Sequence, residues 1–467
     1  MGWVRILLWT ASCMAWGLAA QAQEQAEKLN LELVGYHDLQ GRSAYQQLVH
    51  AQGGRRIAYI GLHGGRLPNG LTGALEDSGT AILDVTDPRR PKLLAHIPGA
   101  PGGGAQMVRV CNGAELPRAD KSKVYLLRPF GNSAQEVWNV TDPARPALVS
   151  TVASKLHGTH KNWWERDSGI AYLVSGVPGW RTSRMTQIYD LGNPAKPVFI
   201  RNFGLPGQQP GATGPVPTEL HGPISTGPKG NRVYFGYGTN SGGILQIVDR
   251  DKLLRGPKEP TPENLLYPQV GRLDLGPDAG AHTAFPVLGM DVAEFAKDKE
   301  GRARDFVVIT SESLAEECRE PRQMMRMVDV SAESRPFPVA NWTVPEASGN
   351  FCSRGGRFGT HSSNESFSAI YYKRIMFFAH FNAGVRAVDI RNPYQPKEIG
   401  YYIPAATDRT DKRCVKSDAG AERCNGVIQT NNVEVDDRGY IYIVDRAHTG
   451  MHILELTDPA RAIAAPK

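Results

Sequence analysis

The sequence predicts an all-β protein, a seven-bladed β-propeller with four-stranded blades. One segment pattern recurs seven times along the chain, and two further stretches of strand character precede each copy. With 50 Gly and 33 Pro among 467 residues, turns are frequent, which favours many short strands over long helices. The last copy lacks a fourth strand, whereas a matching strand stands near residue 30, ahead of the first copy.

The first 22 residues have the layout of a secretory signal peptide. A single basic residue, Arg5, precedes an apolar run from Ile6 to Leu18, and small residues follow up to Ala22. The run is shorter than the ~20 residues that a membrane-spanning helix needs. We therefore expect residues 1–22 to be cleaved. Residues 23–467 would then form a single propeller domain that is periplasmic or secreted and has no membrane span.

The repeated unit is a strand, a turn of the pattern Asp-Pro-x-x-Pro, and a second strand. The Asp or Asn caps its own turn, and the first Pro fixes φ. The second Pro begins the next strand where no ladder hydrogen bond is needed. The copies are "ILDVTDPRRPKLL" from Ile82, "VWNVTDPARPALV" from Val137, "IYDLGNPAKPVFI" from Ile188, the degenerate "IVDRDKLLRG" from Ile247, "MVDVSAESRPFPV" from Met327, "AVDIRNPYQPKEI" from Ala387 and "ILELTDPARAIAA" from Ile453.

Two strands precede each copy and complete a four-stranded blade. The nearer one is apolar and β-branched, as in "IAYIGL" or "IMFFAH". The farther one is short and is predicted to line the central axis. We expect the seven axial strands to open at Gln47, Gln106, His160, His221, His282, His361 and Asn432. The strand "LNLELVGYHDL" would complete the seventh blade and close the ring, which removes free sheet edges.

The repeats resemble the LVIVD repeat, found in a family of exported bacterial propellers, and the likeness covers nearly all of the predicted mature chain. The resemblance implies the propeller fold. It implies no particular activity, because propellers host unrelated functions.

Seven of the chain's 12 histidines fall at two structurally equivalent places that should meet at one end of the propeller. The first place is the opening of the axial strand in four consecutive blades, so those imidazoles should surround a common centre. Such a ring is either a metal site or a polar plug. We predict the metal ligands to be His160, His221, His282 and His361.

Imidazole favours transition metals, with copper preferred and iron or zinc as alternatives. Oxygen ligands, which calcium requires, are not the repeated type here. Four axial histidines resemble the iron site of carotenoid cleavage oxygenases. The histidine-rich mouth of the predicted propeller is also similar to the copper sites of nitrous-oxide-reductase-like and thiocyanate-dehydrogenase-like propellers. It is similar as well to the copper sites of methanethiol oxidases of the selenium-binding-protein family.

The second place is the loop after the second strand of a blade, which holds further histidines. Carboxylates near both places, among them Glu312 and Asp445, could orient a ligand histidine by accepting its second ring N–H. Trp163 and Trp164 are expected to pack between blades. The predicted catalytic residues are His63, His380, His448, Glu219 and Glu365.

The sequence therefore predicts a periplasmic metal-dependent oxidoreductase that acts on a small molecule at a histidine-lined propeller mouth. A non-catalytic binding or scaffold propeller, with a protein partner on one face, and a metal-dependent hydrolase are the alternatives. No G-x-S-x-G elbow, P-loop or dinucleotide fingerprint occurs. The 53 basic and 47 acidic residues form no basic stripe, so we expect no nucleic-acid partner.

Cysteine positions fit an oxidising compartment. We expect disulfides between Cys414 and Cys424 and between Cys318 and Cys352, with Cys111 buried and free. These pairs fall in two predicted loop insertions, near residues 314–358 and 404–428. In the scaffold alternative, these insertions would matter more than the histidines.

Overall fold

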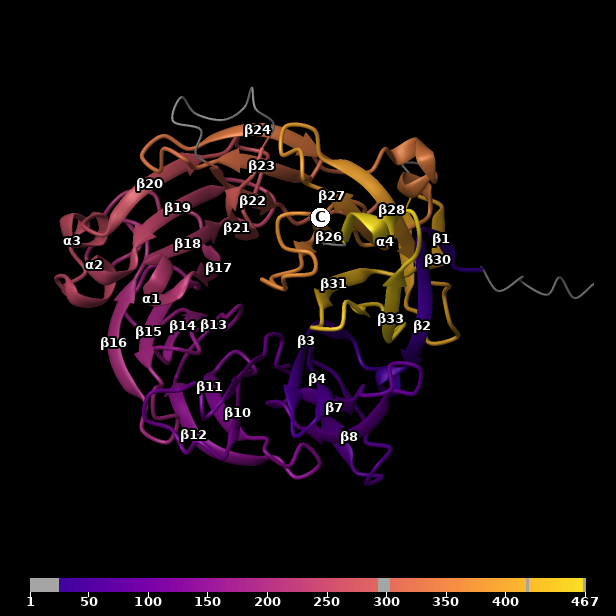
Figure 1. Cartoon of the computed structure of the whole chain (residues 1–467), viewed down its shortest axis with the longest axis horizontal. Coiled ribbons are helices and arrows are strands. Elements are labelled where there is room, and N and C mark those ends of the chain that lie inside the picture. The colour runs from indigo at the N-terminus through magenta and orange to yellow at the C-terminus, as the bar shows by residue number, and fades with distance from the viewer. Residues whose placement is uncertain (1–24, 293–302, 417–419, 465–467) are drawn as a thin grey trace, which may run out of the picture.

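The computed structural model describes residues 25–292, 303–416 and 420–464, and the predicted signal peptide lies outside them. Seven four-stranded antiparallel sheets stand around a central axis, which confirms the predicted seven-bladed propeller (Figure 1). In each blade the strands follow one another from the axis outward, and neighbours pair in antiparallel fashion.

Blades 1 to 4 come from the first part of the chain. Blade 1 contains β3 (Ala44–Gln52), β4 (Arg55–Leu62), β7 (Thr80–Asp84) and β8 (Lys92–Ile97). Blade 2 contains β9 (Arg109–Asn112), β10 (Val124–Phe130), β11 (Ala134–Asn139) and β12 (Ala147–Ser154). Blade 3 contains β13 (Trp163–Trp164), β14 (Ile170–Ser175), β15 (Met185–Asp190) and β16 (Val198–Phe203). Blade 4 contains β17 (Leu220–Ser225), β18 (Arg232–Tyr237), β19 (Ile244–Asp249) and β20 (Gln269–Asp274).

Blades 5 to 7 complete the ring. Blade 5 contains β21 (Thr283–Met290), β22 (Arg304–Thr310), β23 (Met325–Asp329) and β24 (Phe337–Trp342). Blade 6 contains β25 (Ser362–Ser363), β26 (Ile375–Ala379), β27 (Val385–Asp389) and β28 (Lys397–Ile403), with β1 (Glu27–Leu29) added at its outer edge. Blade 7 contains β31 (Thr430–Val435), β32 (Ile441–Asp445), β33 (Met451–Leu456) and β2 (Leu31–His37).

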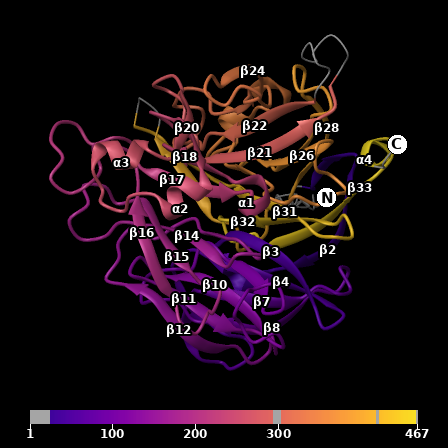
Figure 2. The same cartoon turned by 60° about the vertical axis from the view of Figure 1, so that its left-hand side comes forward.

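The N-terminal strand closes the ring as predicted. Strand β2 pairs antiparallel with β33, with Leu33 opposite Leu454. At the axis, β31 of blade 7 lies beside β3 of blade 1 (Figures 1 and 2). There the Asn431 side-chain amide donates to the Tyr45 carbonyl oxygen at 2.7 Å. Strand β2, from the N-terminal part of the chain, and strand β33, from the C-terminal part, therefore share blade 7.

The repeated turn has the predicted capping chemistry. Oδ1 of Asp84 accepts the backbone N–H of Thr86 at 2.9 Å, and Asp389 accepts that of Arg391 at 3.0 Å. The degenerate copy in blade 4 has no Asp-Pro turn; its Asp249 instead accepts the N–H of Lys252 at 2.9 Å and caps a short helix. In the Asp-Pro turn and in the short helix alike, a carboxylate side chain accepts a backbone N–H group that would otherwise have no partner.

Few other elements lie outside the blades. The hairpins are β5 (Arg66–Pro68) with β6 (Leu75–Asp77), and β29 (Lys412–Lys416) with β30 (Glu422–Gly426). The helices are α1 (Gly227–Gly230), α2 (Arg250–Arg255), α3 (Pro262–Leu266) and α4 (Ala460–Ala464), and the 3-10 turns are η1 (Leu39–Gly41), η3 (Glu346–Ser348) and η4 (Phe351–Ser353).

The core lies between blades. An apolar cluster fills each contact between neighbouring sheets in the described part of the chain. Strand β4 shows how: Ile57 and Tyr59 face blade 2, whereas Ala58, Ile60 and Leu62 face blade 7. Because successive side chains point to opposite faces of a sheet, a strand buried on both faces reads as a continuous apolar run.

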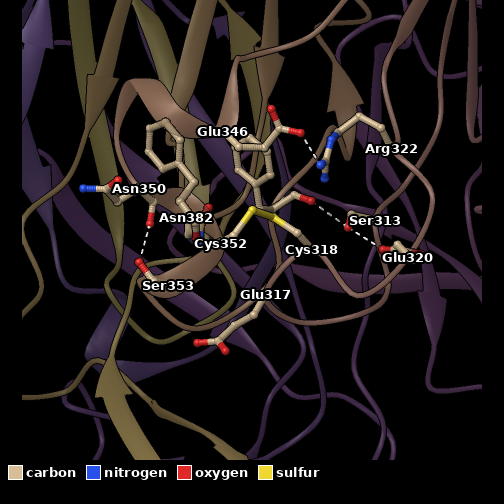
Figure 3. Close-up of a disulfide and its surroundings, with 12 residues drawn as sticks. Ser313, Glu317, Cys318, Glu320, Arg322, Glu346, Asn350, Cys352, Ser353 and Asn382 are labelled. Atoms are coloured by element: carbon tan, nitrogen blue, oxygen red, sulfur yellow. Dashed lines mark hydrogen bonds and ion pairs between the residues drawn. A yellow bond between two sulfur atoms is a disulfide. The ribbon is translucent and has the colours of Figure 1, made fainter. Parts of the chain in front are cut away.

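Both predicted disulfides form. Cys318 and Cys352 join two loops on either side of β23 and β24, and Figure 3 shows this bridge with its surroundings. Cys414 and Cys424 stand opposite each other in the hairpin of β29 and β30. Cys111 is buried without a disulfide, as predicted, and its burial raises the pKa of the thiol.

The predicted insertions need one correction. The range 314–358 contains β23 and β24, which are blade strands, so the inserted chain is two loops at residues 311–324 and 343–361. The range 404–428 carries the β29–β30 hairpin. No helix in the described residues is long and apolar enough to cross a bilayer.

Candidate metal centre

The four histidines of blades 3 to 6 are placed by the backbone at the start of the innermost strands. His160 donates its N–H to the Val174 carbonyl at 3.0 Å, and His361 donates to Ala379 at 2.9 Å, each on the second strand of its own blade. His282 directly precedes β21, and His221 is the second residue of β17. We call these four residues the axial histidines; none is more than 4 % exposed.

The axial imidazoles converge, as the repeats predicted. Nε2 of His160 lies 3.0 Å from Nε2 of His221. The ring centroids of His221 and His282 are 3.6 Å apart, and those of His282 and His361 are 4.5 Å apart. Four rings from four blades therefore form one continuous cluster on the axis.

Tyrosine and asparagine take the equivalent position in the blades where the ring closes. In blade 4 a register shift between Leu220 and Gly222 sets His221 toward the axis. The same shift leaves Tyr45 at that place in blade 1 and Asn431 in blade 7. The sequence pattern predicts Gln47 and Asn432 at this position, and the prediction is wrong because counting along the strand cannot locate a β-bulge, which adds one residue.

Tyr45 and Asn431 both contact the cluster. The Tyr45 hydroxyl is 3.0 Å from Nε2 of His160. The Asn431 carbonyl oxygen accepts a hydrogen bond from Nδ1 of His361. That bond puts the Nδ1 proton on the outer side of the ring and leaves the Nε2 lone pair of His361 facing the centre.

Two other axial rings are held in a similar way. Nδ1 of His160 lies 2.7 Å from Oε1 of Gln106, in blade 2, an amide oxygen that can only accept a hydrogen bond. Nδ1 of His282 lies 3.1 Å from the Thr283 hydroxyl. Contacts of this kind fix the orientation of a ligand histidine.

Glu312, in the loop after β22, is the carboxylate of the cluster. Its Oε2 lies 3.5 Å from Nε2 of His282 and 3.9 Å from Nε2 of His221. Its Oε1 lies 3.7 Å from Nε2 of His361. His221, His282 and Glu312 each offer one ligand atom, and these atoms lie within 4.8 Å of one another.

Arginines stand behind Glu312. Nη1 of Arg357 is 3.1 Å from Oε1 of Glu312, and Nη1 of Arg446 is 3.6 Å from the same oxygen. Asp445 is buried and accepts the N–H groups of Gln429 and Ala447, both at 2.6 Å, so it shapes the loop that carries Arg446 rather than touching an axial ring.

Burial dominates the electrostatics of the centre. It lowers the pKa of all four axial histidines well below the usual value, and neighbouring cations lower each pKa further. Burial also raises the pKa of Glu312, against the opposing pull of Arg446 and Arg357. At neutral pH the imidazoles are therefore uncharged, with lone pairs free to bind a cation.

The three predicted loop histidines do not share one environment. His63 lies near the centre: its Nδ1 is 3.1 Å from the Ser43 hydroxyl, and its ring contacts Tyr45 edge-on at 5.2 Å. His380 packs against Phe358 and Trp342 in an apolar surrounding, with centroid distances of 4.9 and 6.3 Å.

His448 faces the hairpin insertion. Its Nδ1 donates to the Gly41 carbonyl at 2.7 Å, and its Nε2 is 3.5 Å from Asp411. The described residues show no contact of His448 or His380 with an axial ring. Of the predicted loop histidines, only His63 is therefore brought next to the cluster.

The two glutamates predicted to be catalytic also lie in different environments. Glu219 is exposed and accepts the Ser183 N–H at 3.2 Å. Glu365 is buried one layer further along the axis, where it pairs with Lys161 and, at 2.5 Å, with Nη2 of Arg109. We call Arg109, Lys161 and Glu365 the charged layer.

The charged layer contacts the axial histidines through one residue. Nζ of Lys161 donates to the Thr283 hydroxyl at 2.9 Å, and that hydroxyl also contacts His282. Beyond the layer, the opposite end of the channel opens into a pocket of about 1180 Å³. None of its lining residues is an axial histidine, so the histidine cluster is a buried centre rather than an open mouth.

Comparison with known proteins gives no closer assignment: no family model matches the chain, and no curated protein matches it.

Proposed function

We propose that this protein is a metal-dependent oxidoreductase whose metal, copper or iron, is held by His160, His221, His282 and His361 with Glu312. The observation that carries the proposal is the convergence of buried Nε2 atoms and one carboxylate at a single point on the axis. Glu312 joins the predicted ligand set because of its distances to three of the four rings.

A metal accounts for the cluster better than a polar plug does. Nε2 of His282 and Nε2 of His361 are buried and have no hydrogen-bond partner in the described part of the chain. A buried polar atom without a partner costs about 1–3 kcal/mol, so such atoms usually signal a missing partner. A cation at the centre would engage these lone pairs together.

The donor set favours a redox metal of the first transition row. Imidazole nitrogen suits copper, iron and zinc, and divalent copper binds such sites most tightly in this series. The carboxylate of Glu312 is equally acceptable to iron. When bound, copper or iron would supply one-electron chemistry and Lewis acidity at the axis.

The chain's own residues would supply positioning and proton chemistry. Gln106 and Asn431 hold the rings of His160 and His361 so that Nε2 faces the centre. Arg357 fixes the position of the Glu312 carboxyl group, which would release its proton on binding the metal, because burial raises its pKa in the metal-free protein. The Tyr45 hydroxyl, 3.0 Å from Nε2 of His160, can donate a hydrogen bond at the centre, and burial raises its pKa so that it keeps its proton.

We also propose a periplasmic location and membership of the LVIVD repeat propellers. Two disulfides are typical of proteins outside the reducing cytosol. The signal-like first 22 residues support export. The Asp-Pro-x-x-Pro turns at equivalent places in the blades support the family resemblance.

Elemental analysis of protein purified without chelator tests the proposal. We expect about one copper or iron per chain in the natural protein and loss of that metal in a His160→Ala, His221→Ala double variant. His452→Ala is the matched control, because His452 is a buried histidine that packs on Tyr36 away from the axis. It should retain full metal content.

The other possible outcomes of the elemental analysis would favour the alternative functions. Stoichiometric zinc in place of copper or iron would favour the metal-dependent hydrolase. Metal retained by the double variant, or no metal in the natural protein, would contradict the proposed centre and favour a non-catalytic propeller.

A further inference from the structure

The pocket opposite the axial histidines is built by all seven blades. Each blade contributes residues from its innermost strand or from the segment that follows it. Representatives of blades 1 to 7 in order are Val49, Arg109, Trp163, Ser225, Leu288, Phe367 and Glu434. At about 1180 Å³ it is larger than most sites for small organic ligands, which span about 300–1000 Å³.

One wall of the pocket is aromatic. The Trp163 and Phe367 rings meet edge-on at 6.4 Å, and Phe367 contacts Tyr372 at 5.3 Å. All three residues line the pocket, and Phe367 is 41 % exposed although it is a large apolar side chain. Exposed aromatic surface inside a concavity favours a ligand with a flat apolar part. Trp163, predicted to pack between blades, is half-buried and also lines the pocket.

A cation stands beside the aromatic wall. The Arg109 guanidinium lies 4.7 Å from the centroid of Trp163. Its Nε donates to the Asn162 carbonyl at 2.9 Å and its Nη2 to Glu365 at 2.5 Å. Its Nη1 has no hydrogen-bond partner among the described residues, so one edge of the guanidinium remains available to a ligand.

Three glutamates that line the pocket are paired with cations or protonated. Glu165 is held by Arg250, with 2.7 Å between Oε2 and Nη2. Glu365 belongs to the charged layer. Burial raises the pKa of Glu434 to about 8, so that its carboxyl is mostly protonated at neutral pH.

The remaining charged side chains on the wall are mainly cationic. They are Arg166, Lys229, Lys373 and Asp167. Lys229 is exposed. With the acids of the floor neutral or paired, the pocket presents an excess of positive charge to a ligand.

We propose that this pocket binds an aromatic carboxylate, with its ring against Phe367 and Trp163 and its carboxylate toward Arg109. Guanidinium groups bind carboxylates with matched geometry, and aromatic walls bind planar rings. The proposal does not rest on the metal centre, because the charged layer separates the pocket from the axial histidines.

Isothermal titration calorimetry with size-matched probes tests the ligand class. The probes are 2-naphthoate, the neutral 2-naphthalenemethanol, the cationic 2-naphthylmethylamine and the aliphatic anion decanoate. We expect saturable binding of 2-naphthoate at one site, with at least tenfold weaker binding of each other probe. Absence of saturable 2-naphthoate binding at millimolar concentration, or equal binding of the amine, would overturn the proposal.

Substitutions locate the binding. Phe367→Ala should weaken 2-naphthoate binding at least fivefold, and Lys229→Gln with Lys373→Gln should weaken it about threefold. Phe199→Ala is the matched control, because Phe199 is 50 % exposed on β16 at the outer edge of blade 3. It should bind as the natural protein does. Unchanged binding in Phe367→Ala, or equal losses in both phenylalanine variants, would refute the assigned site.

The experiment separates this proposal from the metal centre. The His160→Ala, His221→Ala variant should bind 2-naphthoate with unchanged affinity even if it has lost its metal. Loss of binding in that variant, with a folded circular dichroism spectrum retained, would contradict a separate pocket.

Discussion

The two ends of the central channel are made by the same seven strands and differ in their chemistry. At the end where the strands begin, neutral imidazoles face one another, and Nε2 of His282 and Nε2 of His361 have no hydrogen-bond partner among the described residues. At the other end, aromatic rings and paired charges line a wide pocket. The role of an axial side chain therefore depends more on its position along the innermost strand than on the blade that carries it.

The charged layer lies between these two ends and touches both. Lys161 reaches Thr283, which contacts His282, while Glu365 and Arg109 line the pocket. Glu365 compensates both cations, and all three side chains are buried. The layer therefore links the stability of the two ends.

Removal of Glu365 should have the largest effect. In Glu365→Ala, Arg109 and Lys161 lose their buried counter-ion, which typically costs about 3–5 kcal/mol. Glu219→Ala, which removes an exposed glutamate, should change stability by no more than about 0.5 kcal/mol. Urea denaturation followed by tryptophan fluorescence measures both. Similar midpoints for the two variants would show that the layer is not a stabilising connection.

Protonation of Glu434 should give a smaller and pH-dependent effect. Burial and then the charge of Glu365 raise its pKa to about 8, partly offset by Arg109 and Lys161. Because the folded state holds this proton more tightly than the unfolded state, the stabilising contribution is complete below about pH 4.5. It falls as pH rises and is lost once pH exceeds about 8.

Glu434→Gln should remove this dependence. At about 1.4 kcal/mol per pKa unit, the natural protein should lose a few kcal/mol relative to the variant between pH 4.5 and 8. Denaturant midpoints of the two proteins at several pH values give the difference. A constant difference across that range would mean that Glu434 is ionised in the folded protein, and the pocket would then be less cationic.

Replacement of the Tyr45 hydroxyl should have the smallest effect. In metal-free protein, Tyr45→Phe removes the contact with Nε2 of His160 and should cost about 1 kcal/mol. In metal-loaded protein the cost should be smaller, because the proposed centre engages that nitrogen. Thermal unfolding with and without copper compares the two states, and an equal cost in both would count against His160 as a ligand.

The repeats made most of the fold predictable. Seven copies of one turn, each with two strands ahead of it, require a closed ring. The unpaired strand near residue 30 could then only complete the seventh blade. The disulfide pairs followed from loop position. The extent of the 314–358 insertion did not, because blade strands β23 and β24 lie inside that range between two unusually long loops.

The sequence predicted the site residues that recur with the same identity in several blades. It did not predict those whose identity differs from blade to blade. Histidine at one position in four blades indicated a cluster on the axis. Tyr45 and Asn431 occupy the same position but are not histidines. A β-bulge in each strand shifts the pairing register, so counting residues does not place them there. The far pocket was missed because Phe367 and Glu434 follow no repeated pattern; their proximity arises only when seven strands surround one axis.

The most direct test of the central claim is an anomalous difference map from crystals of the purified protein, recorded on either side of the copper and iron absorption edges. The account predicts one strong peak bounded by Nε2 of the axial histidines and the carboxylate of Glu312. A map without a peak at that point, with water molecules bound to the Nε2 atoms of His282 and His361, would contradict it.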